Sequence, residues 1–198
     1  MELQDSPLLK AAHLCLAGAS GEEAAISATR VMEYVKGGDW ETALLLLEDL
    51  GDAHPQSPEF WELLADAARL LWLKEDAHWY AWRGSEARVG AFRAGLHLLP
   101  AEDGGRSMPL LPRGRLEFLW DIGHRTSEGA LSVSFAFLWI ERRDPLQTGG
   151  SAPVRLLPLT PEHWRHLQPG DSITMHEARP PVGTALITEV IPPVAPST

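Results

Sequence analysis

Three histidines in the last third of the sequence have the side-chain chemistry of a metal site. His163 and His166 are three residues apart, so on one helical turn both imidazoles face the same direction. His176 follows on an expected strand, and a catalytic zinc is commonly held by three protein ligands of this kind. One hypothesis is therefore a metal-assisted hydrolase at His163, His166 and His176, and three solvated histidines are the alternative.

The rest of the sequence offers little for catalysis. The single cysteine, Cys15, stands between Leu14 and Leu16, where a buried thiol without a neighbouring base is expected. The chain has no GxSxG nucleophile motif and no GxxxxGK[ST] phosphate loop. We therefore expect a protein that is not an enzyme, with no catalytic residue, no bound metal and no cofactor, and keep the hydrolase as an alternative.

Charge divides the chain into two halves. Residues 1–90 carry 7 basic and 16 acidic side chains, which is −9 of the net −10, whereas residues 91–198 are close to neutral. A strongly acidic surface repels phosphate backbones and attracts basic proteins. We therefore expect a protein partner with a basic surface, and we expect nucleic acid not to be bound.

Hydropathy and cysteine usage suggest a compartment. No apolar run approaches the roughly 18 residues that would span a bilayer, and a single cysteine fits a reducing environment. The expectation is a cytoplasmic protein without membrane contact.

The first half of the sequence predicts helices. Apolar residues recur three and four positions apart after each of three capping signals, as they do in amphipathic helices. The expected core face of the third helix consists of Phe60, Trp61, Leu64, Ala68, Leu71 and Trp72. The expected caps are Ser20-Gly21-Glu22-Glu23, Asp39 and Ser57-Pro58, the expected ends are Gly37-Gly38 and Gly51, and a fourth helix is expected from Glu75 to Arg88.

A faint repeat runs through these helices. Ala43 and Ala77 are 34 residues apart, which is the tetratricopeptide period, and Pro55 and Trp61 fall on further positions of that motif. The region resembles about one and a half tetratricopeptide units, which implies antiparallel helical hairpins. A plain antiparallel bundle is the alternative.

The apolar period changes from about 3.6 to 2 after Gly90, which indicates strands. Several short alternating strands separated by Gly and Pro turns are typical of an antiparallel barrel or sandwich, with alternate apolar residues filling the interior. The expected strands are Phe92–Leu98, Leu116–Ile122, Leu131–Trp139, Val154–Leu157, Ser172–His176 and Thr184–Ile191.

Turn motifs in this half resemble the third domain of elongation factor Tu. Glu102-Asp103-Gly104-Gly105-Arg106 follows the first strand as in that family, Pro169-Gly170-Asp171 matches its PGD turn, and Val182-Gly183 matches the start of its last strand. The resemblance covers residues 91–193 and implies a translation-factor-type β-barrel. It also implies an alternative function, a translation accessory protein that binds tRNA or a ribosomal factor.

The predicted fold class is α+β. A helical region at 1–90, with tetratricopeptide-like antiparallel hairpins, precedes an elongation-factor-Tu-domain-III-like antiparallel barrel at 91–193. Residues 194–198 are rich in proline and are expected to form a disordered tail.

The main functional hypothesis is a non-catalytic protein-binding module, with an inhibitor or immunity-type role as one form of it. Trp and Tyr dominate interface hot spots, and they crowd the helices, where they form either the core or an exposed patch. The residues expected to contact the partner are Glu59, Glu62, Asp66, Trp79 and Trp82.

Overall fold

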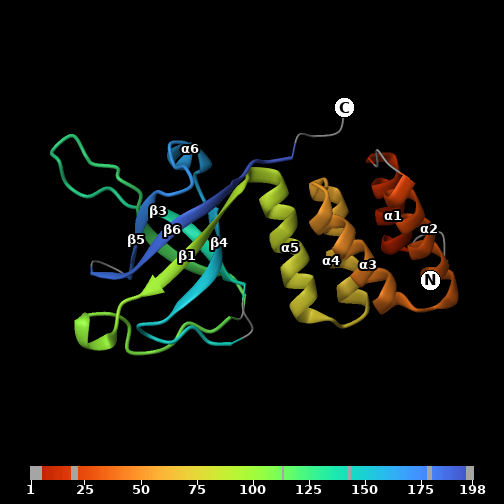
Figure 1. The fold of residues 1–198 in the computed structure, drawn as a ribbon, viewed down its shortest axis with the longest axis horizontal. Helices are drawn as coiled ribbons and strands as arrows, with labels where there is room; N and C mark the ends of the chain where they lie inside the picture. Colours follow the sequence, from red (N-terminus) through yellow and green to blue (C-terminus); the bar gives the residue numbers. More distant parts are fainter. Residues whose placement is uncertain (1–5, 19–21, 113, 142–143, 178–179, 195–198) are drawn as a thin grey trace. The chain divides into compact units, whose positions relative to one another are not determined.

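The computed structural model describes residues 6–18, 22–112, 114–141, 144–177 and 180–194, and no side chain of residues 16–28. The chain forms two compact units, drawn in Figure 1. One consists of the helices up to Arg88 together with Val194, and the other runs from Val89 to Pro193. The fold is α+β, as predicted. In the expected tail at 194–198, the Val194 amide donates to the carbonyl of Ala87 at 2.8 Å, and residues 195–198 lie outside the described residues.

Among the residues that the structure describes, the helical unit contains five helices, which lie side by side in Figure 1. They are α1 (Pro7–Gly18), α2 (Glu22–Gly37), α3 (Trp40–Ala53), α4 (Pro58–Leu70) and α5 (Lys74–Val89). No helix in the described part of the chain is long and apolar enough to cross a bilayer.

Helix α1 was not among the expected helices, although its sequence carries the signal. Leu8, Ala11, Ala12 and Cys15 are buried and recur at the spacing of one helical face. Burial raises the pKa of the Cys15 thiol from 9.0 to about 11. The expectation of a buried, unreactive thiol is therefore confirmed by its surroundings.

Two of the expected helix caps are confirmed. The Asp39 carboxylate accepts a hydrogen bond from the Thr42 amide at 3.3 Å, at the start of α3. The Ser57 hydroxyl accepts one from the Phe60 amide at 3.2 Å, with Pro58 in the first turn of α4. Each cap satisfies an amide that the helix itself leaves without a partner. The expected capping box at 20–23 lies outside the described side chains.

The prediction that Gly51 ends a helix is wrong, because α3 continues to Ala53. Gly51 is instead a point of close packing. A Cβ atom at this position would lie 2.5 Å from Cη2 of Trp61 and 2.9 Å from Cε1 of Phe60. Only glycine lets these two rings of α4 approach the α3 backbone so closely.

Aromatic side chains form the centre of the helical core. The ring of Trp61 packs edge-on against Phe60, with centroids 5.1 Å apart, and is stacked on Tyr80 at 6.2 Å. The guanidinium of Arg83 lies 4.2 Å from the Trp61 ring centroid, in cation–π geometry. Trp61 is thus core, as one of the two interpretations of the tryptophan-rich helices expected.

The second unit is a closed six-stranded barrel in which every neighbouring pair is antiparallel. The strand order around it is β1-β4-β3-β2-β5-β6, and one short helix, α6 (Pro161–Trp164), precedes β5. Continuous strand begins at Ala91, which confirms the change of period after Gly90. The strands are β1 (Ala91–Leu98), β2 (Leu116–Asp121), β3 (Ser134–Ile140), β4 (Ser151–Pro158), β5 (Ser172–His176) and β6 (Pro181–Ile191).

The sequence alternation of Leu131, Val133, Phe135, Phe137 and Trp139 predicts that these residues face the interior, and this phase is wrong. The side chains of β3 that are buried are Ser134, Ala136, Leu138 and Ile140, whereas Phe135 is 48% exposed. The pairing register explains why these side chains, and not Phe135, face the interior. Ser134 lies opposite Trp120, and Ala136 lies opposite Phe118, so small residues of β3 face large residues of β2 inside the barrel.

Glycines make the tight turn after β1 possible. Gly104 has a φ of +86°, and a Cβ atom at Gly105 would lie 2.1 Å from the carbonyl oxygen of Leu99. The expected PGD turn is also present, since Gly170 has a φ of +99° and the Asp171 carboxylate accepts from the Gln168 amide at 2.7 Å. These turns set where β1 ends and β5 begins.

Candidate partner-binding surface

The turn between α4 and α5 is a Schellman motif built around Trp72. Leu71 is the C-cap of α4, and Trp72 follows it with a left-handed φ of 63°. The Trp72 amide donates to the carbonyl of Arg69 at 3.1 Å, and the Leu73 amide donates to the carbonyl of Ala68 at 2.9 Å. These two bonds satisfy carbonyls at the end of the helix.

Tryptophan is an unfavourable residue for this position. A left-handed conformation brings the Cβ of an L-residue close to its carbonyl oxygen, which costs roughly 1–2 kcal/mol, and glycine avoids this cost. Among the described residues, Trp72 is the only one other than glycine with a positive φ. The turns that follow α2 and α5 have glycine in this conformation, Gly38 and Gly90, both with a φ of +81°.

The side chain of Trp72 packs little against the core. It is 83% exposed, and the neighbouring Leu70 is 54% exposed. The expectation that Trp72 belongs to the core face of the third helix is therefore wrong, because α4 ends at Leu70 and the turn directs Trp72 away from that face. A large exposed aromatic residue held in a strained conformation is a feature of binding sites.

A pocket adjoins this turn within the helical unit. It has a volume of about 230 Å³ and is lined almost entirely by apolar side chains. Leu70 and Leu71, which directly precede Trp72, form part of its wall. The other lining residues are Ser6, Pro7, Leu8, Trp40 and Ala67. We call Leu70, Trp72 and this pocket the Trp72 surface.

Ser6 is the one polar residue that lines the pocket. It is fully buried, and its hydroxyl has no hydrogen-bond partner in the described structure. The residue directly precedes Pro7, so it stands where a serine usually caps a helix, but the α1 cap is not made by this side chain. A buried hydroxyl without a partner costs about 1–3 kcal/mol.

Exposed acidic side chains lie close in the sequence to the residues of the Trp72 surface. Asp39 and Glu41 flank Trp40 of the pocket wall, Asp66 lies one helical turn before Leu70, and other carboxylates follow Trp72 on α5. On these segments the exposed carboxylates outnumber the exposed cations. The carboxylates are Asp39, Glu41, Asp66, Glu75 and Asp76, and the cations are Arg69 and Lys74, with Lys36 before Asp39 and Lys10 on α1 also exposed.

The three acidic residues expected to contact the partner are exposed on α4. Glu59, Glu62 and Asp66 recur three and four positions apart, so they share one face of the helix. Two of them are paired: Glu62 with Arg88 of α5, and Asp66 with Arg69 at 2.5 Å. Their negative charge is therefore partly neutralised.

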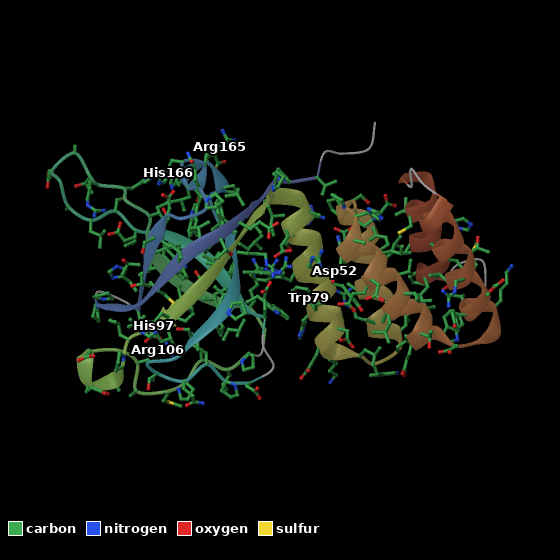
Figure 2. All side chains as sticks on the ribbon, in the orientation of Figure 1. Asp52, Trp79, His97, Arg106, Arg165 and His166 are labelled. Carbon is green, nitrogen blue, oxygen red and sulfur yellow. The ribbon has the colours of Figure 1, made fainter. Side chains whose placement is uncertain are left out.

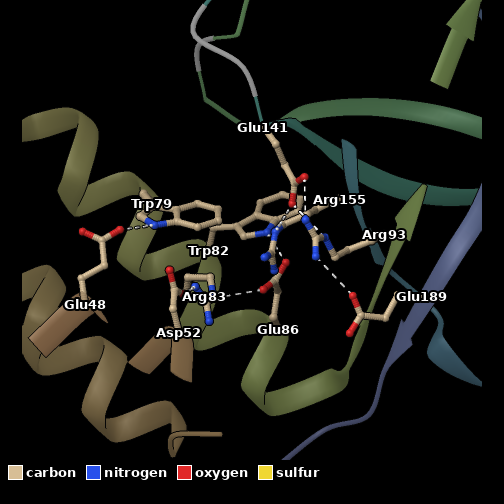
Figure 3. Close-up of polar contacts among 10 residues, drawn as sticks. All are labelled: Glu48, Asp52, Trp79, Trp82, Arg83, Glu86, Arg93, Glu141, Arg155 and Glu189. Carbon is tan, nitrogen blue, oxygen red and sulfur yellow. Dashed lines mark hydrogen bonds and ion pairs between the residues drawn. The ribbon is translucent and has the colours of Figure 1, made fainter. Parts of the chain in front are cut away.

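The two tryptophans expected to contact the partner are tied into the helical unit, as Figure 3 shows. Trp79 is half-buried, and its indole nitrogen donates to Glu48 at 2.9 Å. Trp82 is only 4% exposed and donates to Glu86 at 2.7 Å. In this structure Trp82 is therefore buried, whereas Trp79 is partly exposed.

The three histidines of the metal hypothesis do not form a metal site. His124, which the sequence analysis did not consider, lies against His166 and His163, with ring centroids 4.9 and 5.8 Å away. His166, labelled beside α6 in Figure 2, donates through Nε2 to the carbonyl of Ile122 at 2.8 Å. His176 is buried on β5. In the part of the chain that the structure describes, no group of three or more His, Cys, Asp or Glu could hold a metal ion.

One serine–histidine contact occurs on the barrel. Nδ1 of His97 lies 3.0 Å from Oγ of Ser151, across the β1–β4 pair. A hydrolytic triad also needs a group that orients the histidine, and the contacts of the described residues give His97 no carboxylate. The pair is therefore a cross-strand hydrogen bond.

Four of the six barrel arginines whose side chains the structure describes form ion pairs with carboxylates. Glu141 accepts from both Arg93 at 3.1 Å and Arg155 at 2.7 Å, as Figure 3 shows. Arg106 pairs with Glu177, and Arg125 pairs with Asp121 at 2.9 Å, where it helps to lower the pKa of that carboxyl group. Paired arginines offer less charge to a phosphate backbone than free ones.

Sequence reasoning missed Trp72 as a surface residue, although one signal was present. Residues 70–73 read Leu-Leu-Trp-Leu, and four consecutive apolar residues cannot all lie on one face of a helix. At least one of them has to point away from the core. No family model matches the chain, and no curated protein matches it.

Proposed function

We propose that this protein is a non-catalytic binding module for a protein partner, and that the partner contacts the Trp72 surface of the helical unit. The observation that carries the proposal is Trp72 itself. Its φ of 63° favours glycine and its side chain is 83% exposed, so folding explains neither the residue type nor its position. An exposed tryptophan beside an apolar pocket is well suited to anchor a protein interface.

The charge around this surface supports a basic partner. The helical half carries −9, and exposed carboxylates predominate around Trp72. Carboxylates at the rim of an interface steer a basic protein towards it and fix its orientation. An inhibitor or immunity-type role is one form of this function, and the identity of the partner decides it.

The test is affinity capture with immobilised wild-type protein and variants from lysate of the source cells, with and without RNase. A basic protein should be captured by the wild type and lost with Trp72→Gly in both lysates. Leu45→Ala is the matched control, because Leu45 is 60% exposed on the same unit but does not line the pocket. Equal capture of every protein by wild type and Trp72→Gly would exclude the proposal.

The alternative of a translation accessory protein rests on the resemblance of the barrel to the third domain of elongation factor Tu. The closed antiparallel barrel and the turns at Gly105 and Gly170 support that kinship. The paired arginines of the barrel and the charge of the helical half argue against tRNA as the ligand. RNase-sensitive capture would favour this alternative.

The repeat resemblance of the helical unit also stays a proposal. Ala43 and Ala77 are buried with 0% and 3% exposure, which fits the small residues that let tetratricopeptide helices approach closely. Such repeats commonly present surfaces for other proteins. The tetratricopeptide-like resemblance therefore also supports a protein-binding function.

A further inference from the structure

We infer that the pocket beside Trp72 receives one aromatic side chain with a polar tip, of the tyrosine type, from the basic protein partner. This inference rests on the proposed function for the identity of the partner. The pocket itself is observed independently of it, from its volume, its lining and the unpaired hydroxyl of Ser6.

The volume of the pocket sets the size of its occupant. An apolar cavity of about 150 Å³ in a protein takes up a molecule of benzene. The pocket has about 230 Å³, which leaves room for a substituted benzene ring. A small aliphatic side chain would leave much of this space empty, and unfilled space forfeits dispersion contacts.

The lining of the pocket sets the chemistry of most of that occupant. Pro7, Leu8, Ala67 and Leu71 present carbon atoms, and Trp40 adds an aromatic ring. Aromatic rings pack favourably against one another beyond the area that they bury. An apolar ring thus fits the walls of the pocket better than a charged group, whose desolvation would not be repaid.

Ser6 favours a polar atom at the end of that ring. Its hydroxyl is buried without a partner and is attached to Cβ, so rotation about χ1 moves it between three staggered positions. A phenolic hydroxyl that reaches it would satisfy a group that now has no hydrogen bond. A net hydrogen bond of this kind changes an affinity by about 2- to 12-fold.

The acidic rim connects the pocket to the partner. Asp39 and Glu41 are exposed and adjoin the lining residue Trp40 in the chain, and exposed Asp66 directly precedes the lining residue Ala67, so basic residues next to the inserted ring would have carboxylates nearby to pair with. The expected occupant is therefore an aromatic residue within a basic segment.

Two small probes test the pocket without the partner. p-Cresol carries the ring and hydroxyl of tyrosine, and toluene is the same ring without the hydroxyl. Titration of the full-length protein, followed by methyl NMR signals of Leu8, Ala67 and Leu71, should give saturable shifts with both probes. In Ser6→Ala the affinity for p-cresol should fall by about 2- to 12-fold, and the affinity for toluene should change by less than 2-fold.

A second variant guards against an indirect effect of Ser6→Ala. Ala67→Leu extends a wall residue into the pocket and should weaken both probes together, with the circular dichroism spectrum confirming that the helices are retained. Absence of saturable shifts at the pocket, or equal responses of both probes to Ser6→Ala, would overturn the inference. Trp72→Gly leaves the pocket walls in place, so probe binding by this variant separates a failure of the inference from a failure of the proposed function.

Discussion

Trp72 occupies at the end of α4 the same structural position that Gly38 occupies at the end of α2. Their φ angles are 63° and 81°, and in both turns the residue donates to a carbonyl three positions back while the next residue donates to one five positions back. Glycine meets the demands of this position at no steric cost, and tryptophan does not. Because the turn at Gly38 forms with glycine, the tryptophan at 72 is not required by the turn.

Trp72→Gly should stabilise the protein. The substitution removes the left-handed strain of an L-residue, worth roughly 1–2 kcal/mol, and part of this gain is offset by the greater freedom of glycine in the unfolded chain. The free energy of unfolding should rise by up to about 1 kcal/mol, measured by urea unfolding followed at 222 nm. The same variant should lose the partner, so stability and binding move in opposite directions.

Trp72→Ala is the control for this prediction. Alanine removes the indole ring but keeps the strained backbone, so binding should be lost without the gain in stability. A Trp72→Gly protein that unfolds at lower urea concentration than the wild type would show that the ring stabilises the fold, and the functional argument from strain would fail.

Gly51→Ala should destabilise the helical unit. Alanine is the better helix former by about 1 kcal/mol, but its Cβ would lie 2.5 Å from the ring of Trp61. Overpacking of a core costs typically 1–3 kcal/mol, so the clash should outweigh the propensity. We expect a net loss of about 1–2 kcal/mol in urea unfolding.

Gly37→Ala is the matched comparison, because it lies at the end of α2 and a Cβ there meets nothing within 4 Å. This variant should be as stable as the wild type or slightly more stable. Equal responses of Gly51→Ala and Gly37→Ala would mean that the ring of Trp61 moves aside without cost.

Gly105→Ala should disrupt the turn after β1 in the barrel. The added carbon would lie 2.1 Å from the backbone oxygen of Leu99, and a backbone atom cannot give way as a side chain can. A loss of more than about 1 kcal/mol is expected, in line with other changes that strain a backbone turn. Gly95→Ala, on β1 with open space around its Cβ, should be nearly neutral. A neutral Gly105→Ala would contradict the turn geometry.

Local features of the chain could be predicted from the sequence, whereas features set by distant residues could not. Turns and the boundary at Gly90 depend on local chemistry, so β1 and β5 were expected at or near their observed limits. The phase of β3 depends on the opposite strand. Both faces of β3 are apolar, and only the pairing with Phe118 and Trp120 places the smaller residues inside.

The candidate site was harder to predict for the same reason. The exposure of Trp72 follows from where α4 ends, and the Schellman turn that ends it has no glycine to reveal it in the sequence. The contact of His124 with His163 and His166 joins segments about forty residues apart, which no local spacing indicates. The acidic face of α4 was predictable, because it follows from helical spacing alone.

Stability should fall at alkaline pH through two groups of the helical unit. Burial raises the pKa of Cys15 from 9.0 to about 11, and burial together with Glu48 raises the pKa of Tyr80. A raised pKa in the folded state means that the unfolded chain loses its proton first, so the stabilising contribution is complete below the unfolded pKa and is lost as pH rises. For Cys15 this loss should occur between about pH 9 and 11.

Cys15→Ala tests how much of the loss of stability at alkaline pH comes from the Cys15 thiol. A shift from 9.0 to about 11 corresponds to at most about 2–3 kcal/mol at the alkaline end. The variant should therefore show a flatter dependence of unfolding free energy on pH above 9 than the wild type, and Tyr80 should account for the part that remains above pH 10. Parallel curves for the two proteins would show that the thiol is not protected from ionisation.

Association with the partner should be fast at low salt and slower as salt rises, because long-range attraction between the acidic helical unit and a basic protein is screened by ions. Reversal of the three carboxylates of the α4 face to lysine should slow association several-fold at low salt and reduce its salt dependence. Two of these residues pair with Arg88 and Arg69 at the surface, and such exposed pairs contribute only about 0–1 kcal/mol, so the fold should survive. The substitutions are Glu59→Lys, Glu62→Lys and Asp66→Lys.

The matched control changes the net charge equally on the other unit. Glu102, Asp103 and Glu128 are exposed on the barrel, and their reversal to lysine adds the same six positive charges. If the α4 face guides the partner, the helical variant should slow association markedly more than the barrel variant, since steering depends on where charge lies as well as on its sum. Equal slowing would assign the effect to net charge alone. Tight, salt-sensitive binding of the wild type to bulk tRNA would instead contradict the protein-partner account and favour the translation accessory function.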